Sequence, residues 1–301
     1  MAVQASAVLK GVLRLTSRHE AKMAAGLKGS QATGRIHSLA TFHKYAYALK
    51  GAGDWAREQA GLAHPKAFTR ELAQQYLADR AAQGIGQKQL DADRIALEFV
   101  TGKGSLARER ALTTAERHSR AYTPGQIELI ASHQGQENAL ATEIAWRAGL
   151  RAHELLTIRR GTEAAPSPHR RWRSERFYGR EGDRYIVTGK GGLRREVILP
   201  YELAMRLEKH SLKQPRTVRD RGLDYRQYYD IGGGNAWSKS FGEASDRALG
   251  WSTGAHGLRH RYAQERMREL QDQGKNYYHA RNIVSQELGH FRGDVLEIYL
   301  R

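Results

Sequence analysis

Seven side chains in the second half of this 301-residue sequence are of types that act on phosphate groups: two arginines, two histidines, a lysine, a tyrosine and a glutamate. In chain order they are Arg151, Glu154, Lys190, His256, Arg259, His290 and Tyr299. Guanidinium groups match phosphate oxygens with two parallel hydrogen bonds. Imidazole and amine groups exchange protons, and a phenol oxygen can act as a nucleophile. The set therefore suits displacement chemistry at a phosphate.

The spacing of these residues predicts the elements that position them. Arg151 and Glu154 are three residues apart, as are His256 and Arg259, so each pair can share one face of a helix. Lys190 stands in GKGG between two β-rich runs, RYIVTGK and RREVILP, which is typical of a hairpin with glycines in its turn. Separate segments of the chain must fold together for the seven side chains to meet.

Several cofactor motifs are missing from the sequence. GKGG is not the phosphate-binding loop of nucleotide hydrolases, which needs a longer glycine loop ending in GK[ST] before a helix. There is no His-Glu-x-x-His zinc helix and no acidic cluster placed to hold two magnesium ions, and the chain has no cysteine. We therefore expect no metal and no other cofactor, so that side-chain cations must stabilise the phosphate charge.

The sequence is strongly basic, with 49 Lys and Arg against 32 Asp and Glu and a formal net charge of +17. Such an excess favours a polyanionic partner because each neutralised phosphate releases counterions. Nucleic acid is the leading candidate, while an anionic membrane surface or a ribosomal assembly stays open on charge alone. No apolar run approaches the roughly 20 residues that span a bilayer. Lys10 and Arg14 interrupt the N-terminal run, so it is a poor secretory signal and we expect a cytoplasmic protein.

The first part of the chain reads as an N-terminal segment, residues 1–35, followed by a helical domain, residues 36–112. Apolar residues four apart within residues 8–13 predict a short basic amphipathic helix, which either packs on the domain or contacts nucleic acid. In the domain itself, apolar positions three and four apart predict helices. Gly51 and Gly53 are expected to break the first of them.

A polar stretch without periodicity predicts a linker at residues 113–121, and residues 122–301 form the second domain. This domain combines helices with the predicted hairpin. Residues 161–183 and 213–236 are rich in Arg, Gly and Tyr and are expected to be loops or insertions. The first of them holds the basic run HRRWRSER, which is either a solvated loop or a nucleic-acid contact.

The segments GLRAHEL, GKGG, HGLRH and LGHFRGDVLEIY, in this order, resemble the active-site boxes of the tyrosine recombinases. Tyr299 follows His290 by nine residues, in agreement with that family's pattern. The resemblance covers residues 122–301 well, whereas residues 36–110 resemble the family's core-binding domain only in being helical. It implies a mainly α protein with a small antiparallel β-sheet, in which a helical core-binding domain and a catalytic domain form a clamp on DNA.

The resemblance also implies how the phosphate is bound. Arg151 and Arg259 would bind the non-bridging oxygens of the scissile phosphate, and His290 would donate a further hydrogen bond to it. Glu154 would support the site by orienting Arg151. His260, next to Arg259, is interpreted as a packing residue.

The remaining residues would carry the strand cleavage. Tyr299 would attack phosphorus and form a 3′-phosphotyrosyl bond. A phenol has an ordinary pKa of about 10, so the family pattern assigns His256 as the general base, and Lys190 would protonate the departing 5′ oxygen. The covalent bond conserves the energy of the cleaved one, so rejoining needs neither ATP nor metal.

The implied function is site-specific recombination at double-stranded DNA attachment sites, with integration and excision of a mobile element or phage. The partners would be a homo-tetramer on DNA and accessory DNA-bending or directionality proteins, with no membrane, and the enzyme would be nucleoid-associated when on DNA. Two alternatives remain: a type IB topoisomerase-like activity and a non-catalytic DNA-binding regulator. The sequence ends two residues after Tyr299, whereas many family members carry a tail that packs on a neighbouring subunit.

Overall fold

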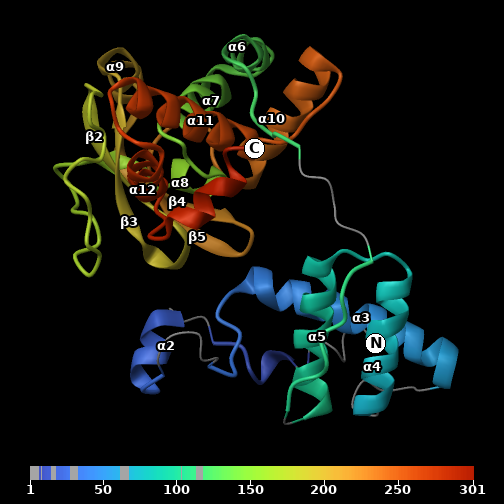
Figure 1. Cartoon of the computed structure of the whole chain (residues 1–301). Coiled ribbons are helices and arrows are strands. Elements are labelled where there is room, and N and C mark those ends of the chain that lie inside the picture. The colour runs from blue at the N-terminus through green and yellow to red at the C-terminus, as the bar shows by residue number, and fades with distance from the viewer. Residues whose placement is uncertain are drawn as a thin grey trace. The chain divides into compact units, whose positions relative to one another are not determined.

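The chain divides into two compact units, Met1–Glu116 and Arg117–Arg301, in a computed structural model (Figure 1). The division falls within the predicted linker, of which residues 113–117 lie outside the described residues. The residues that the structure describes are 7, 9–14, 18–27, 33–61, 68–102, 104–112 and 118–301.

The first unit is helical. Its described part contains α2 (Arg18–Ala24), α3 (Leu39–Ala60), α4 (Arg70–Ala82) and α5 (Gln87–Thr101). The side chain of Thr69 caps α4 by accepting a hydrogen bond from the Leu72 backbone N–H at 3.3 Å. Helix α3 packs against both α4 and α5. Their shared core contains Phe42, Leu49, Tyr76, Leu77 and Leu97.

The expected break at Gly51 and Gly53 is wrong, because α3 runs through both glycines without interruption. A Cβ atom at Gly51 would lie 3.3 Å from the Tyr76 hydroxyl of α4. Ala52 and Ala56 on α3 are also buried. The small residues therefore let α4 approach α3 closely, and this packing outweighs the roughly 1 kcal/mol that a glycine costs inside a helix.

The predicted N-terminal helix does not extend to Leu13. Helical backbone is described only as far as Lys10. Leu13 forms a β-bridge with Ile36, and the Arg14 backbone N–H donates to the Ile36 carbonyl at 2.8 Å. Leu9 is fully buried, and Val8 lies outside the described residues. The apolar residues of this segment therefore pack on the first unit through an extended pairing that sequence periodicity does not reveal.

The second unit is mainly α, as expected, and contains two small antiparallel sheets where one was expected. Strand β2 is central in the first sheet, between β1 and β3, and β4 pairs with β5 in the second. The turn between β2 and β3 holds the short helix η2, and η3 follows α12. The elements are α6 (Pro124–Ser132), α7 (Gln136–Arg147), α8 (Ala152–Leu155), β1 (Arg159–Arg160), β2 (Asp183–Thr188), η2 (Lys190–Gly192), β3 (Arg194–Leu199), α9 (Tyr201–Glu208), β4 (Ser211–Asp220), β5 (Leu223–Tyr229), α10 (Gly234–Leu249), α11 (His256–Asp272), α12 (Tyr277–Glu287) and η3 (Gly293–Ile298).

Two apolar clusters hold the second unit together. One joins the inner face of the first sheet, with Tyr185 and Val197, to helices α7 and α10. The other lies between α11, α12 and η3 and includes Leu288 and Tyr299. The C-terminal end of the described chain is thus part of a packed core.

The prediction of a loop over residues 213–236 is wrong for most of that range. Residues 211–229 form the β4–β5 hairpin, and α10 begins at Gly234. Arg221 and Gly222 form its turn with φ of 48° and 79°, the left-handed geometry that matches the twist of a two-residue hairpin. Most of the hairpin is exposed, so polar residues occupy both faces and hide the alternation. Residues 161–182 contain no helix or strand, in agreement with their prediction.

Replacing Gly149 by alanine is expected to destabilise the second unit by about 2–4 kcal/mol. Gly149 has a φ of 58°, and a Cβ there would lie 2.7 Å from Leu288 and 2.8 Å from Tyr262. Gly125→Ala on α6 is the control, since a Cβ there meets nothing within 4 Å. Urea unfolding of both variants measures the difference, and a cost below about 1 kcal/mol for Gly149→Ala would contradict the packing described.

Candidate active site

Arg151 and Glu154 meet at the start of α8. The Arg151 backbone N–H donates to Glu154 Oε2 at 2.9 Å, and its guanidinium donates to Oε1 at 2.7 Å. Glu154 is fully buried, whereas the Arg151 side chain is 23% exposed. The buried carboxylate therefore fixes the arginine from its buried side and leaves part of the guanidinium open to a ligand.

Arg259 approaches the same place from α11 and is fully buried. Its Nη1 donates to the Gly149 carbonyl at 2.5 Å, and its Nη2 donates to the Leu288 carbonyl. Burial and the charge of Arg151 lower the pKa of Arg259 to about 9. The two arginines come from distant parts of the chain and lie close enough for the charge of Arg151 to lower the pKa of Arg259.

His290 joins the two arginines to the tyrosine. Its Nε2 lies 3.3 Å from a terminal nitrogen of Arg151, 3.3 Å from Nη2 of Arg259 and 3.5 Å from the Tyr299 hydroxyl. Burial and the charges of the two arginines lower the pKa of His290 to about 3. The imidazole is therefore neutral near pH 7, the state in which Nε2 can accept hydrogen bonds.

Tyr299 is 7% exposed and its ring lies among three imidazoles. The ring centroids of His256, His260 and His290 are 5.5, 4.9 and 5.9 Å from that of Tyr299. The Arg259 guanidinium carbon is 5.5 Å from the ring centroid. The structure thus brings together six of the seven residues predicted from the sequence, from α8, α11, and the segment that follows α12.

The two histidines of α11 differ in exposure. His256 is exposed, while His260 is buried, as expected of a packing residue, and packs on the ring of Tyr299 itself. Burial lowers the pKa of His260 to about 4, and the charges of Arg120 and Arg259 add to this effect. Partial desolvation of its ring and the charge of Arg259 lower the pKa of His256 as well. Both rings are therefore neutral near pH 7 and able to accept a proton.

Lys190 lies in the turn between β2 and β3, as predicted, and its side chain is outside the described parts. Gly191 and Gly192 take φ of 72° and 76° there. A Cβ at the preceding Gly189 would lie 2.9 Å from Glu154 Oε1. The backbone of this turn therefore passes directly beside the Arg151–Glu154 pair.

Arg195 is a site residue that the sequence analysis missed. It is 1% exposed on β3, and its Nη2 donates to Glu154 Oε2 at 2.7 Å and to the Gly149 carbonyl at 3.2 Å. Its Nη1 donates to the Glu287 carbonyl at 2.6 Å. The signal was available, because alternation along β3 places Arg195 on the same face as the buried Val197.

Three arginines surround the single carboxylate of Glu154. Burial raises the pKa of Glu154, but the charges of Arg195, Arg151 and Arg259 outweigh burial and hold that pKa well below its ordinary value. The carboxylate is thus ionised at any physiological pH. One buried anion supports three arginines, which leaves an excess of positive charge to stabilise a phosphate.

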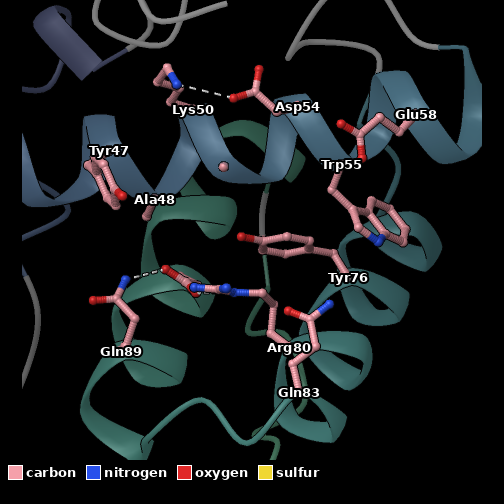
Figure 2. A pocket seen from close by; sticks show the side chains of 12 residues that line it. Tyr47, Ala48, Lys50, Asp54, Trp55, Glu58, Tyr76, Arg80, Gln83 and Gln89 are labelled. Carbon is pink, nitrogen blue, oxygen red and sulfur yellow. Dashed lines mark hydrogen bonds and ion pairs between the residues drawn. The ribbon is translucent and has the colours of Figure 1, made fainter.

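The first unit contains a pocket of about 320 Å³ between α3, α4 and α5 (Figure 2). Lys50 is paired with Asp54 at its rim, and the buried Asp93 is held by Arg80 and Gln89. Three acidic and two basic side chains line it, so the pocket offers no excess of positive charge for phosphate chemistry. Among the described residues, no group of three His, Asp or Glu side chains could hold a metal ion.

The free energy of unfolding is expected to decrease as the pH is lowered from about 6.5 to 4, because of the site histidines. The pKa of His290 and His260 is lowered from 6.5, so in this range the unfolded chain binds more protons than the folded one. The stability linked to these neutral histidines is fully present above pH 6.5 and is lost as the pH falls towards their pKa values in the folded protein. Urea unfolding at several pH values checks this, with tryptophan fluorescence as the signal.

His260→Gln should flatten that pH dependence, whereas His133→Gln, at an exposed position, should leave it unchanged. Parallel curves for wild type and His260→Gln would contradict the assignment.

No protein-family model and no curated protein matches this sequence. Solved structures do match. The XerH site-specific recombinase bound to its difH substrate has a TM-score of 0.54 at 15% identity, over 100% of this chain and 92% of that chain. A lambda integrase dimer bound to a COC′ core site gives 0.55 at 17% identity, over 94% and 75%. The Tn1549 transposon integrase in complex with transposon right end DNA gives 0.51 at 14%, over 95% and 95%.

These likenesses show that the chain has the tyrosine recombinase fold. Among the described residues, no helix is long and apolar enough to cross a membrane.

Proposed function

We propose that this protein is a site-specific DNA recombinase that cuts and rejoins DNA strands through a covalent 3′-phosphotyrosyl intermediate. One observation carries the proposal: the Tyr299 hydroxyl lies 3.5 Å from His290 Nε2, which is itself 3.3 Å from a terminal nitrogen of both Arg151 and Arg259. A phenol beside a pair of phosphate-binding groups is what attack on a phosphodiester requires.

The proposed cleavage step uses the residues as follows. Arg151 and Arg259 bind the non-bridging oxygens and stabilise the charge of the transition state. Once their guanidinium groups turn from His290 to the phosphate, the neutral His290 ring carries its proton on Nε2 and donates a further hydrogen bond to it. The Tyr299 oxygen attacks phosphorus and passes its proton to His256. The bond from phosphorus to the 5′ oxygen breaks, and Lys190 protonates that oxygen. Glu154 and Arg195 hold Arg151 in place.

Rejoining is the reverse of this step. A 5′ hydroxyl attacks the phosphotyrosyl bond, and the phosphodiester bond re-forms as the tyrosine departs. Since the covalent link conserves the bond energy, no ATP is consumed. The arginines stabilise the negative charge of the phosphate, as a metal ion does in other phosphoryl-transfer enzymes.

The proposed partners are double-stranded attachment sites of a mobile element or phage. The net charge of +17 supports a DNA partner. A lambda integrase tetramer has been solved on a Holliday junction, with a TM-score of 0.55 to this chain. By analogy we propose a homo-tetramer on DNA, with accessory DNA-bending or directionality proteins, inside the cytoplasm and on the nucleoid.

A pool of nicked duplexes with a randomised central sequence tests the chemistry without knowledge of the target site. A nick a few nucleotides beyond the cleaved phosphate lets the short fragment with the free 5′ hydroxyl diffuse away and traps the covalent protein–DNA adduct, which denaturing gels detect. The expected result is an adduct in the presence of EDTA. Failure to form any adduct, despite binding to DNA, would favour a non-catalytic regulator instead.

Relaxation of a supercoiled plasmid distinguishes the proposed recombinase from a type IB topoisomerase. The plasmid should lack every sequence recovered in the adducts from the randomised pool. A site-specific recombinase should relax it poorly, whereas a topoisomerase relaxes it efficiently. Efficient relaxation would contradict the site-specific function but leave the covalent mechanism in place.

A further inference from the structure

The β4–β5 hairpin is attached to the second unit by one face. On this face Gln227 donates to the Ile231 carbonyl at 2.8 Å, and Asp220 accepts from the Asn235 backbone N–H at 2.8 Å. The Tyr225 ring lies 6.2 Å, between centroids, from the ring of His153 on α8. The hairpin is therefore fixed beside the helix whose first turn holds the Arg151–Glu154 pair.

The opposite face of the hairpin is basic and open. Thr217 pairs in register with Arg226, and Arg219 with Asp224, so these four side chains share one face. The Arg219 side chain is 72% exposed, and its contact with Asp224 is a loose one of 3.8 Å. The Arg226 side chain is exposed, and its guanidinium makes no hydrogen bond or ion pair with another described residue.

The hairpin also extends away from the site by a length that spans several phosphates of a DNA duplex. Tyr225 follows the turn residue Gly222 by three positions, so the tip extends roughly 10 Å beyond the contact with α8. Duplex DNA carries about one phosphate per 1.7 Å of its axis. DNA with its scissile phosphate at Arg151 thus presents several further phosphates within the length of the hairpin.

We propose that the outward face of the β4–β5 hairpin, through Arg219 and Arg226, binds backbone phosphates of the duplex beside the cleavage site. This inference rests on the proposed function and extends it, because it names a DNA contact outside the cluster around Tyr299. The contact is independent of base sequence: guanidinium groups on an exposed strand face bind phosphate oxygens and position the duplex.

The salt dependence of DNA binding tests the proposal in the full chain. Wild type and Arg219→Gln/Arg226→Gln are titrated with a fluorescent duplex of mixed sequence at several salt concentrations. Each lost phosphate contact lowers the slope of log K against log salt concentration by about 0.9, so the double variant should lose about 1.8 in slope and bind at least tenfold more weakly at physiological salt. Arg219→Lys/Arg226→Lys, which keeps both charges, should retain most of the slope.

The matched control is Lys239→Gln/Arg268→Gln, which removes the same charge from exposed positions. Lys239 lies on α10, and Arg268 lies nine residues beyond Arg259 on α11, on the opposite side of that helix. The slope of the control should match wild type. An equal loss in both double variants would show a general effect of net charge and would overturn the proposal.

The same measurements distinguish failure of this inference from failure of the proposed function. If wild type binds DNA and forms the covalent adduct but the hairpin variant keeps the wild-type slope, only the hairpin contact is wrong. If the variant keeps its slope and loses self-association in sedimentation, the face binds another protein molecule and the proposal is overturned. If wild type binds no duplex and forms no adduct, the proposed function itself fails.

Discussion

Replacing Tyr299 by phenylalanine is expected to abolish the covalent adduct with nicked duplexes, a loss on the order of 10⁴-fold or more. The change removes the one oxygen that would attack phosphorus and keeps the ring that packs against His260 and Arg259. Because most of the buried contacts survive, the variant should fold and bind DNA like wild type. The adduct is measured on denaturing gels, and binding is measured by the shift of the duplex on native gels.

Tyr278→Phe is the matched control, since Tyr278 is an exposed tyrosine on α12. It should form the adduct at the wild-type rate. An adduct with Tyr299→Phe would show that another residue is the nucleophile and that the proposed mechanism is wrong. The site of attachment, found by mass spectrometry of the adduct, should be Tyr299 in the wild-type protein.

Replacing Arg151 by alanine is expected to slow single-turnover cleavage by about 10³–10⁵-fold, the range seen when a positioned arginine is removed from a phosphoryl-transfer site. Arg151 is the arginine of the cluster that is partly open to solvent, and its terminal nitrogen lies 3.3 Å from His290. Its loss removes a charge-assisted hydrogen bond to the transition state. DNA binding should weaken much less, since it draws on many other cations.

The Arg151 variant also carries a stability cost that must be separated from the rate. Glu154 Oε2 keeps the donor from Arg195, whereas Oε1 loses the Arg151 guanidinium, at a cost of about 1–3 kcal/mol. Unfolding curves measure this cost. Added guanidinium ion should restore part of the cleavage rate, and Arg268→Ala should cleave normally. A rate loss below tenfold in the folded variant would contradict the role of Arg151 at the phosphate.

Some features were predictable because they depend on neighbours along the chain. The pairs Arg151–Glu154 and His256–Arg259 follow from helical spacing, and the turn at Lys190 follows from glycines between β-rich runs. These are short-range rules of backbone geometry, and the fold preserved them. The order of the four segments was sufficient to suggest the fold, which the structural likeness then showed.

Other features depended on packing between distant segments. The break expected at Gly51 and Gly53 is absent because α4 packs closely against that part of α3. The loop expected over residues 213–236 is mostly a hairpin, since an exposed ribbon shows no clear apolar alternation. Arg195 was missed because a charged residue in a strand is usually solvated, and only its buried partners reveal its role.

The sequence by itself determined the chemistry available to Tyr299: which cations, imidazoles and carboxylates the chain carries, and which of them share a helix face. The tertiary structure alone decided that Arg151, Arg259, His290 and Tyr299 meet, because contacts across up to 139 positions depend on how α8, α11 and α12 pack. It also decided their protonation. Burial lowers the pKa of the histidines, and the charges of three arginines keep the buried Glu154 ionised. Both effects depend on the folded interior, so no local sequence pattern predicts them.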